Sequence, residues 1–145
     1  MKLLDVNLLV YAYDAGSPVH ERARTWFESC MAETELVGFT LATIVAFVRL
    51  VTDGRIFERP FDIETARSLV DDWLSLPSAI LVLPSARHWE ILGELAVEAQ
   101  VRGPLVPDAH LAACAIESGA TLYTNDRDFL RFKGLRVEFP LSLPA

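Results

Sequence analysis

Three aspartates lie at the ends of apolar segments that are far apart in the chain. Asp5 follows the first apolar run, and Asp108 lies near the start of a predicted helix. Asp126 follows a later apolar run, with Asp128 two positions further on. A carboxylate beside buried apolar residues loses hydration, so it is tolerated only when a cation, hydrogen-bond donors or a function compensates. Because these acids come from distant segments, one shared metal site explains all of them.

The aspartates predict a site for a hard divalent cation. Mg²⁺ prefers oxygen ligands and retains several waters, so a few carboxylates are enough to hold it. We therefore predict Asp5 and Asp108 as direct or water-mediated ligands, and Asp126 as the third metal-binding and catalytic residue. Asp128 has a predicted supporting role, because it either points away from the cleft or caps the segment that follows it.

Each aspartate also has a purely structural interpretation. Asp5 can be a buried acid that backbone donors satisfy, and Asp108 can be an ordinary helix N-cap. Asp126 and Asp128 can lie in a solvated turn. Acids from three distant segments nevertheless favour one functional site over separate structural explanations.

Short apolar segments bounded by turn residues predict strands, and apolar residues at helical spacing predict helices between them. The predicted strands are residues 2–5, 37–39, 79–83, 121–124 and 135–139. The predicted helices begin near Asn7, Val19, Leu41, Asp62, Ser85 and Asp108. Ser85 is a predicted N-cap, and Gly119 fits the C-terminal turn of the last helix.

Strands that alternate with helices predict a mainly parallel central sheet in a three-layer α/β/α domain. We expect a single domain across residues 1–145, a length sufficient for a substantial core. In such sheets, ligands gather beyond the carboxyl ends of the strands. Asp5 and Asp126 are expected at such ends, and Asp108 at a helix start can face the same crevice. The acids can therefore converge.

Composition narrows the functional classes. The formal net charge of −7 argues against a nonspecific nucleic-acid binder with a broad basic surface, but it does not exclude a nuclease whose acids bind metal. The longest apolar stretch, residues 36–48, is interrupted by polar residues and predicts no membrane span. Asp5 and Asn7 interrupt the N-terminal region where a signal peptide would be apolar, so we expect a cytoplasmic protein.

The cysteines and histidines receive no functional role from the sequence. Cys30 and Cys114 lie in apolar, helical contexts without a Cys-x-x-Cys pair, so we expect reduced core thiols and disfavour zinc. His20, His88 and His110 stand singly, and single histidines more often serve packing or the surface than catalysis. No histidine is therefore predicted to be catalytic.

Four short motifs follow one another along the chain. They are Leu4-Asp5-Val6-Asn7, Phe47-Val48-Arg49-Leu50-Val51-Thr52, Pro107-Asp108-Ala109-His110-Leu111-Ala112-Ala113 and Thr124-Asn125-Asp126-Arg127-Asp128-Phe129. Each motif alone is weakly specific, but their order and spacing together are specific. The chain thereby resembles the PIN-domain ribonucleases, especially the toxin components of prokaryotic VapBC toxin–antitoxin pairs, over nearly its whole length.

The resemblance implies a PIN-like fold and a Mg²⁺-dependent endoribonuclease, with Mn²⁺ as an alternative ion. It also implies an RNA substrate, a cognate VapB-like antitoxin and a homodimer. By position, Asp5, Asp108 and Asp126 match the family's metal-binding acids. Asp128 matches an additional, less constant acid of the family.

Asn7, Arg49 and Thr124 are further predicted supporting residues within these motifs. Asn7 is expected to orient Asp5 or to cap the short helix that follows it. Arg49 is expected either to bind a phosphate or to pair with a carboxylate of the cluster. These three residues would assist the acids without binding the metal themselves.

One position departs from the family pattern. Glu usually stands three residues before the Arg of the middle helix, whereas this chain has Ala46 there. No acid occurs between residues 36 and 52, and a hydroxyl of Thr40 or Thr43 would not replace an anionic ligand. We therefore predict reduced metal affinity, and whether one or two metal ions bind stays open.

Three hypotheses follow. The leading one is a metal-dependent endoribonuclease toxin, which uses metal-activated water and is neutralised by an antitoxin in the cleft or a neighbouring groove. The second is a catalytically weakened PIN module that binds RNA or a protein partner. The third is a phosphotransferase or phosphatase with Asp5 as its nucleophile, which the absence of an Asp-x-Asp motif disfavours.

Overall fold

The computed structural model describes residues 1–143, and in this range it contains one five-stranded sheet. Every pair of neighbouring strands is parallel, and the strand order is β3-β2-β1-β4-β5. The strands are β1 (Lys2–Leu4), β2 (Val37–Thr40), β3 (Ala79–Val82), β4 (Thr121–Tyr123) and β5 (Val137–Glu138). The predicted parallel sheet is therefore confirmed.

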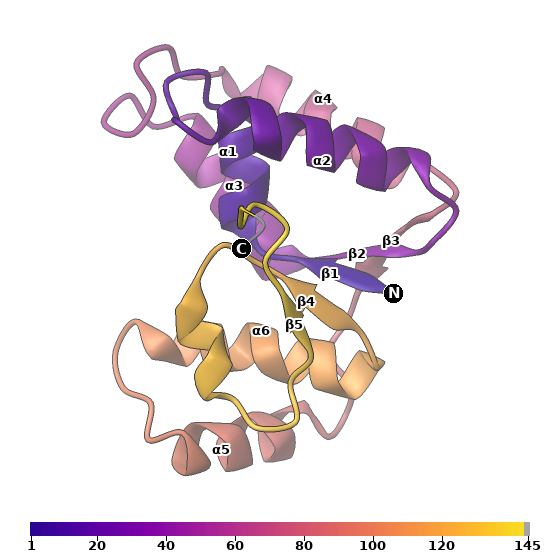
Figure 1. Cartoon of the computed structure of the whole chain (residues 1–145), viewed down its shortest axis with the longest axis vertical. Helices are drawn as coiled ribbons and strands as arrows, with labels where there is room; N and C mark the ends of the chain where they lie inside the picture. Colours follow the sequence, from indigo (N-terminus) through magenta and orange to yellow (C-terminus); the bar gives the residue numbers. More distant parts are fainter. Residues whose placement is uncertain (144–145) are drawn as a thin grey trace.

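Helices cover both faces of this sheet, four on one side and two on the other (Figure 1). The first group is α1 (Val6–Tyr13), α2 (His20–Ala32), α3 (Leu41–Val51) and α4 (Ile63–Leu74). The second group is α5 (His88–Glu98) and α6 (Leu105–Ser118), and the 3-10 helix η1 (Arg127–Arg131) follows β4. The predicted three-layer α/β/α fold is confirmed. Within residues 1–143, no helix has the length and apolar character that crossing a membrane requires.

Successive residues of β1 point to opposite faces of the sheet and so belong to different cores. Leu4 packs with the apolar side chains of the α1–α4 side, whereas Leu3 packs with those of the α5–α6 side. Both side chains are fully buried. A Cβ added to Gly38 of β2 would lie 2.7 Å from Cγ2 of Val82, so the close approach of β2 and β3 requires glycine there.

The ends of α5 and α6 test two sequence predictions. Gly119 ends α6 with a left-handed φ of 69°, as predicted. Ser85 as the N-cap of a helix is wrong, because α5 begins after Arg87 and has no side-chain cap. The Ser85 amide and hydroxyl instead donate to the Glu117 carboxylate of α6, at 2.9 and 3.2 Å. The Ser85 hydroxyl also accepts from the Arg87 amide at 3.2 Å, so Ser85 links the segment before α5 to Glu117 without capping the helix.

The carboxyl ends of β1 and β4 lie side by side, because Leu4 pairs with Tyr123 in the parallel register. Asp5 directly follows β1, and Thr124 directly follows β4. The topology thus brings polar residues from the two ends of the chain to one edge of the sheet, where parallel sheets bind their ligands.

Candidate active site

Asp5 connects β1 to α1. Its Oδ1 accepts a 2.7 Å hydrogen bond from the Val6 amide, so Asp5 itself is the N-cap of α1. Capping this helix is therefore not the role of Asn7. The Asp5 side chain is largely buried, and the residue is 9% exposed. Backbone donation satisfies one carboxylate oxygen and leaves the other, Oδ2, to side chains.

Thr124 is the centre of a hydrogen-bond network around Asp5. Its fully buried hydroxyl donates to Asp5 Oδ2 at 2.7 Å and accepts from the Asp126 amide at 3.0 Å. Asn7 Nδ2 donates to the same Asp5 oxygen at 3.1 Å, and Asn7 Oδ1 accepts from the Asn125 amide at 3.2 Å. Asn7 thus orients Asp5, and together with Thr124 it ties the carboxylate to the turn after β4.

Asp126 and Asp128 lie in this turn, at the start of η1. Asp126 caps η1, since its Oδ1 accepts from the Asp128 amide at 2.9 Å. Asp126 is half-buried, whereas Asp128 is exposed. Asp128 therefore does not cap the segment that follows, and its carboxylate is free to face the other acids.

Asp108 comes from α6, a different element from the turn that carries Asp126 and Asp128. It lies in the first turn of α6, with Pro104 at the cap position, so the interpretation of Asp108 as an N-cap is wrong. A carboxylate oxygen from each of Asp108, Asp126 and Asp128 lies within 4.8 Å of the other two. Asp5 is not a member of this group of three and adjoins it, as the electrostatics below indicate.

The four aspartates act on one another electrostatically. Burial, and after it the negative charges of the other three aspartates, raise the pKa of Asp108 to about 6, while Arg131 opposes the rise. Burial also raises the pKa of Asp5, although hydrogen bonds from Thr124 and the Val6 amide favour its ionised form. Negative charge is thus concentrated here at a cost in free energy.

No basic group within residues 1–143 balances this charge by direct contact. No Lys, Arg or His nitrogen lies within 4.0 Å of a carboxylate oxygen of the four acids. Clustered carboxylates without a basic partner are the donor set that Mg²⁺ and Mn²⁺ prefer. The acids that the sequence singles out therefore fit a divalent cation.

The family is decided by comparison with known proteins. The family model of the PIN domain matches residues 2–135. Ribonuclease VapC37 of Mycobacterium tuberculosis is 41% identical over 143 residues, which cover 99% of each chain. The chain belongs to the VapC group of PIN-domain proteins. A second relative of this PIN domain, VapC ribonuclease Mb2897 of Mycobacterium bovis, is 38% identical and covers 98% of this chain and 97% of its own.

Solved structures share the fold of this PIN domain. Mycobacterium tuberculosis VapC20, described as a sarcin-ricin loop cleaving toxin, aligns with a TM-score of 0.68 at 19% identity, covering 94% of this chain and 99% of that one. VapBC2 from Rickettsia felis, bound to a DNA fragment from its promoter, aligns with a TM-score of 0.66 at 23% identity, covering 94% and 96%. The predicted family resemblance is confirmed.

Arg49 lies apart from the acids of this PIN domain. It is exposed on α3, and its charge helps to lower the pKa of Asp53, where Arg55 is the larger cause. Within residues 1–143 it forms no ion pair with a carboxylate. The predicted pairing of Arg49 with the acidic cluster is therefore wrong, and contact with a phosphate stays a prediction.

Thr40 and Thr43 place two hydroxyl groups at the start of the middle helix of this PIN domain, α3. The Thr40 hydroxyl accepts from the Thr43 amide at 3.1 Å and donates to the Thr43 hydroxyl at 3.0 Å. Both threonines are buried. Their hydroxyls are largely committed to capping α3, so nothing here replaces the carboxylate that Ala46 lacks.

Arg131 is a residue whose relevance the sequence did not single out. It lies on η1, where its Nε donates to the Asp128 carbonyl at 3.2 Å. It is also the one basic residue among the named causes of the Asp108 pKa shift. In the sequence, the indication of a role for Arg131 was its position three residues after Asp128. The effect of its charge on the pKa of Asp108 became visible in the structure of the turn after β4.

Proposed function

We propose that this PIN domain is an endoribonuclease toxin that hydrolyses RNA phosphodiester bonds and is neutralised by a cognate antitoxin. The observation that carries the proposal is the convergence of Asp108, Asp126 and Asp128 beside Asp5, without a basic partner among residues 1–143. Relatives over nearly the full length are named ribonucleases, which supports RNA as the substrate.

A divalent cation is part of this proposal, with Mg²⁺ as the resident ion and Mn²⁺ as its substitute. Asp108, Asp126 and Asp128 would hold the ion with Asp5, directly or through water. A bound cation supplies an activated water and neutralises negative charge on the phosphate oxygens. The protein's own residues must therefore orient the acids, keep them ionised and leave the ion open to the phosphodiester.

The chain's own residues supply these three conditions. Thr124 and Asn7 hold the buried oxygen of Asp5 in one orientation through bonds of 2.7 and 3.1 Å. With a pKa of about 6, Asp108 is mostly ionised at pH 7 and above and becomes protonated as the pH falls below about 6. Exposed Asp128 leaves the cluster open toward solvent, where a phosphodiester can approach.

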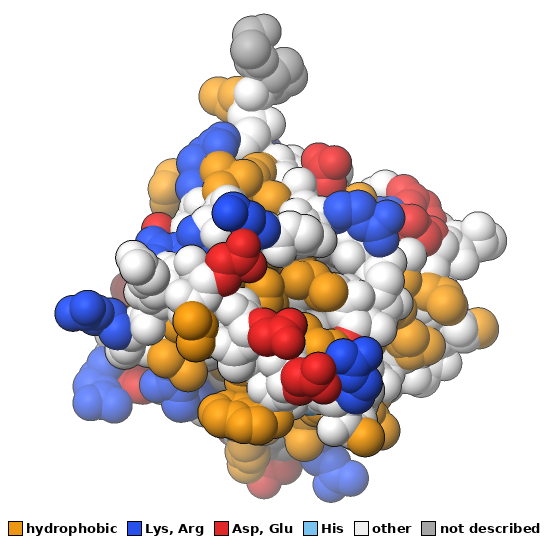
Figure 2. Space-filling view, turned by 90° about the horizontal axis from the view of Figure 1, so that it is seen from below, with side chains coloured by type: hydrophobic (Ala, Val, Ile, Leu, Met, Phe, Trp, Pro, Cys, Tyr) orange, Lys and Arg blue, Asp and Glu red, His pale blue; other side chains and the backbone are white. Residues whose placement is uncertain are grey.

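RNA binding cannot depend on a broad basic surface in this chain. Figure 2 shows acidic, basic and apolar side chains interspersed on the face seen from below, without a continuous basic band there. The net charge of −7 has the same consequence. Attraction of RNA then depends on the bound cation and on individual arginines such as Arg131, whose charge reaches Asp108.

A groove on the other side of the sheet offers a seat for the antitoxin. It lies between α1, α2 and α4, has a volume of about 690 Å³ and is lined mainly by apolar side chains. These include Ala12, Tyr13, Phe27, Met31, Trp73 and Leu76. An apolar segment of an antitoxin would fit there.

Homodimerisation in the cytoplasm completes the proposal, and exposed Trp89 and Val97 on α5 offer apolar surface for it.

A catalytically weakened module that binds RNA or a protein partner is the second candidate. The observation that favours it is Ala46, together with the commitment of the Thr40 and Thr43 hydroxyls to α3. A phosphatase that uses Asp5 as nucleophile has no comparable support, because both oxygens of Asp5 accept hydrogen bonds from the protein.

Cleavage of a mixed RNA pool by the purified protein tests the proposal. Reactions contain Mg²⁺, Mn²⁺ or EDTA, and Asp5→Ala is purified in parallel to reveal contaminating nuclease. Asp71→Asn is the matched control, because Asp71 is an exposed acid on α4 that pairs with Arg67. We expect cleavage by the wild type and the control with either metal, and none with EDTA or Asp5→Ala.

Two results would contradict the proposal. Cleavage that persists in Asp5→Ala or in EDTA would assign the activity to a contaminant or to metal-independent chemistry. Folded wild-type protein that binds RNA without cleaving it under either metal would favour the weakened module.

A further inference from the structure

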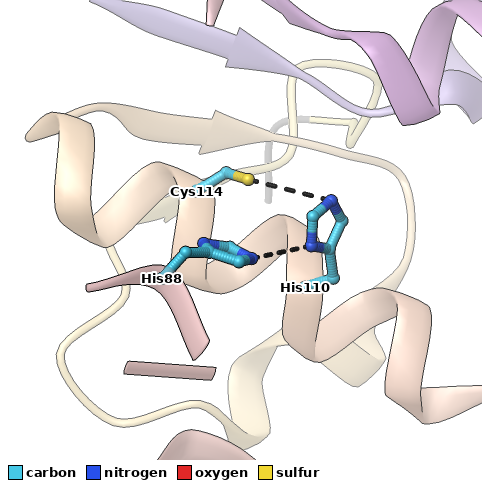
Figure 3. Close-up of side chains that lie close together, drawn as sticks. All are labelled: His88, His110 and Cys114. Atoms are coloured by element: carbon cyan, nitrogen blue, oxygen red, sulfur yellow. Dashed lines mark hydrogen bonds between the residues drawn. The ribbon is translucent and has the colours of Figure 1, made fainter. Parts of the chain in front are cut away.

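A second group of metal-binding side chains lies between α5 and α6, on residues that the proposed nuclease site does not use. His88 begins α5, and His110 and Cys114 lie one turn apart on α6. His88 Nε2 is 2.8 Å from His110 Nδ1, and His110 Nε2 is 4.0 Å from the Cys114 sulfur. Figure 3 shows the three side chains pointing toward one another.

Glu117 lies behind this group. Its side chain is 6% exposed, and Oε1 lies 3.2 Å from His88 Nδ1. The two atoms are within ion-pair distance, but their orientation does not meet hydrogen-bond geometry, so the buried Nδ1 lacks a hydrogen-bond partner. Ser85 donates twice to the same carboxylate. A buried acid thus faces a histidine nitrogen that is not yet satisfied.

We propose that His88, His110 and Cys114 form a binding site for a zinc-class transition-metal ion that joins the start of α5 to α6. Imidazole nitrogen and thiolate sulfur are the ligands that Zn²⁺ prefers, whereas Mg²⁺ prefers oxygen. One ligand atom from each residue lies within 4.8 Å of the other two. The site is therefore chemically distinct from the acidic cluster and independent of the proposed nuclease activity.

Binding of one ion requires modest side-chain movements. With Zn–N near 2.0 Å and Zn–S near 2.3 Å, ligand atoms of a tetrahedral ion lie about 3.3 to 3.6 Å apart. An imidazole binds a single ion through one nitrogen, so His110 offers either Nδ1, which is 2.8 Å from His88 Nε2, or Nε2, which is 4.0 Å from the Cys114 sulfur. One ligand atom from each residue lies within 4.8 Å of the other two, so the ligand atoms must approach one another by up to about 1 Å. Three protein ligands leave the fourth position to water.

The charge of the metal-bound site, compared with that of Glu117, also supports a zinc-class ion. A divalent ion bound by two neutral imidazoles and one thiolate carries a net charge of +1. Buried Glu117 forms no Lys or Arg ion pair within residues 1–143, so this net positive charge would compensate its carboxylate. Metal-binding histidines commonly donate their second nitrogen to such a carboxylate, which is where His88 Nδ1 lies relative to Glu117.

Without metal, the group is an imperfect polar cluster in a largely apolar interface. Burial raises the pKa of the Cys114 thiol to about 11, so a binding ion must displace its proton. The contacts within the group are one hydrogen bond between two imidazoles and one long hydrogen bond between the Cys114 sulfur and His110. A bound ion would give the sulfur a strong partner and would align His88 with Glu117.

Titration of the purified, metal-free full-length chain with Co²⁺ tests this proposal, because tetrahedral Co²⁺ bound to thiolate absorbs strongly by charge transfer. We expect this band to saturate at one Co²⁺ per chain and to disappear on addition of Zn²⁺. Cys114→Ala should abolish it. Cys30→Ala removes the other buried cysteine and should leave it intact. Asp108→Asn should also leave it intact, because oxygen ligands give no thiolate band.

Two further variants separate metal binding from folding. His88→Gln and Glu117→Gln should each weaken Co²⁺ binding by roughly 10- to 100-fold, with an unchanged circular dichroism spectrum. Zn²⁺ should raise the Tm of the wild type by about 5 °C and should have no such effect on His88→Gln. If the folded wild type shows no thiolate band, or loses it in Cys30→Ala, the group is a hydrogen-bonded cluster and the proposal is wrong.

Discussion

The two ligand clusters of this molecule share one helix and differ in nearly every other respect. α6 supplies Asp108 to the acidic cluster and supplies both His110 and Cys114 to the cluster beneath α5. Asp108 and His110 are two residues apart, so they point in directions that differ by about 200° around the helix. One helix can therefore serve two sites without sharing a side chain between them.

The clusters also differ in the chemistry and solvent exposure of their side chains. In the acidic cluster, burial and, after it, like charges raise the pKa of Asp108, and the cluster opens to solvent through Asp128. The cluster of His88, His110 and Cys114 is largely buried and is built from imidazole and thiol groups instead of carboxylates. The acidic cluster suits a hard, exchangeable, partly hydrated ion, and the other suits a softer ion held for structure.

The largest expected effect is on RNA cleavage, which should depend on the acidic cluster and not on the cluster of His88, His110 and Cys114. Asp108→Asn keeps the size of the side chain but removes a charge from the acidic cluster. We expect RNA cleavage to fall by at least about 100-fold, since even the loss of an outer-shell partner of a metal typically costs 10- to 100-fold. Steady-state cleavage rates in Mg²⁺, measured beside the Asp71→Asn control, check this. Retention of more than a tenth of the activity would remove Asp108 from the metal-binding set.

The next effect concerns the hydrogen-bond network that holds Asp5. Thr124→Val keeps the shape but removes the hydroxyl that binds Asp5 Oδ2 and the Asp126 amide. We expect cleavage to fall by roughly 10- to 100-fold, with recovery in Thr124→Ser. Thr121→Val in the preceding strand β4 is the matched control, since Thr121 makes no side-chain hydrogen bond to the acids. Equal loss in both valine variants would indicate damage to β4 and would contradict a positioning role for Thr124.

The convergence of the acids at one edge of the sheet could be predicted because strand ends are a topological property, whereas the metal-binding role of Asp5, Asp108 and Asp126 stays a prediction. Once the segments before Asp5 and Thr124 are recognised as parallel strands, their carboxyl ends must share one edge of a sheet. The motif spacing then added Asp108. The exact partners were beyond prediction, because the bonds of Thr124 depend on the rotamer of a buried hydroxyl.

The cluster of His88, His110 and Cys114 could not be predicted from the sequence. His110 and Cys114 have helical spacing, but His88 lies 22 positions earlier and meets them only through the packing of α5 on α6. The absence of a Cys-x-x-Cys pair made zinc an unfavourable prediction from the sequence. Ser85 was assigned a local capping role for the same reason, since nothing in the sequence indicated that Glu117 would bind it.

Ionised Asp108 should destabilise the folded chain, because its burial and, after it, the charges of the other three aspartates disfavour its negative charge. The pKa of Asp108 is about 6 in the folded chain and is 3.8 as its ordinary value, so the folded state favours the protonated form. The contribution of Asp108 to the free energy of unfolding is present in full below about pH 3.8 and is lost as the pH rises through about 6. In EDTA at pH 7.5, Asp108→Asn should therefore raise the Tm by a few degrees, after allowance for solvent screening.

The pH profile distinguishes this explanation from a general effect of the mutation. The difference in Tm between Asp108→Asn and the wild type should shrink as the pH falls from 7.5 through 6 toward 4, because protonated Asp108 is already neutral. Asp71→Asn should show no such trend, since Asp71 pairs with Arg67 and lies outside the cluster. Scanning calorimetry in EDTA measures both. A constant or growing difference at low pH would contradict the raised pKa of Asp108, to which burial contributes most and the other three aspartates next, as the cause.

The smallest effect tests whether α3 can reach the acidic cluster. Ala46→Glu restores the acid that the family pattern places there, and an added carboxylate near the ion should tighten Mn²⁺ binding by about fivefold, or roughly 1 kcal/mol. Ala46→Gln isolates the charge, and Ala42→Glu places the same charge on an exposed position one turn earlier. Calorimetric titration with Mn²⁺ should show tightening in Ala46→Glu alone, while the Co²⁺ thiolate band stays unchanged. Equal affinity in all four proteins would mean that position 46 does not face the acids, so the chain's departure from the family pattern would carry no cost in metal binding.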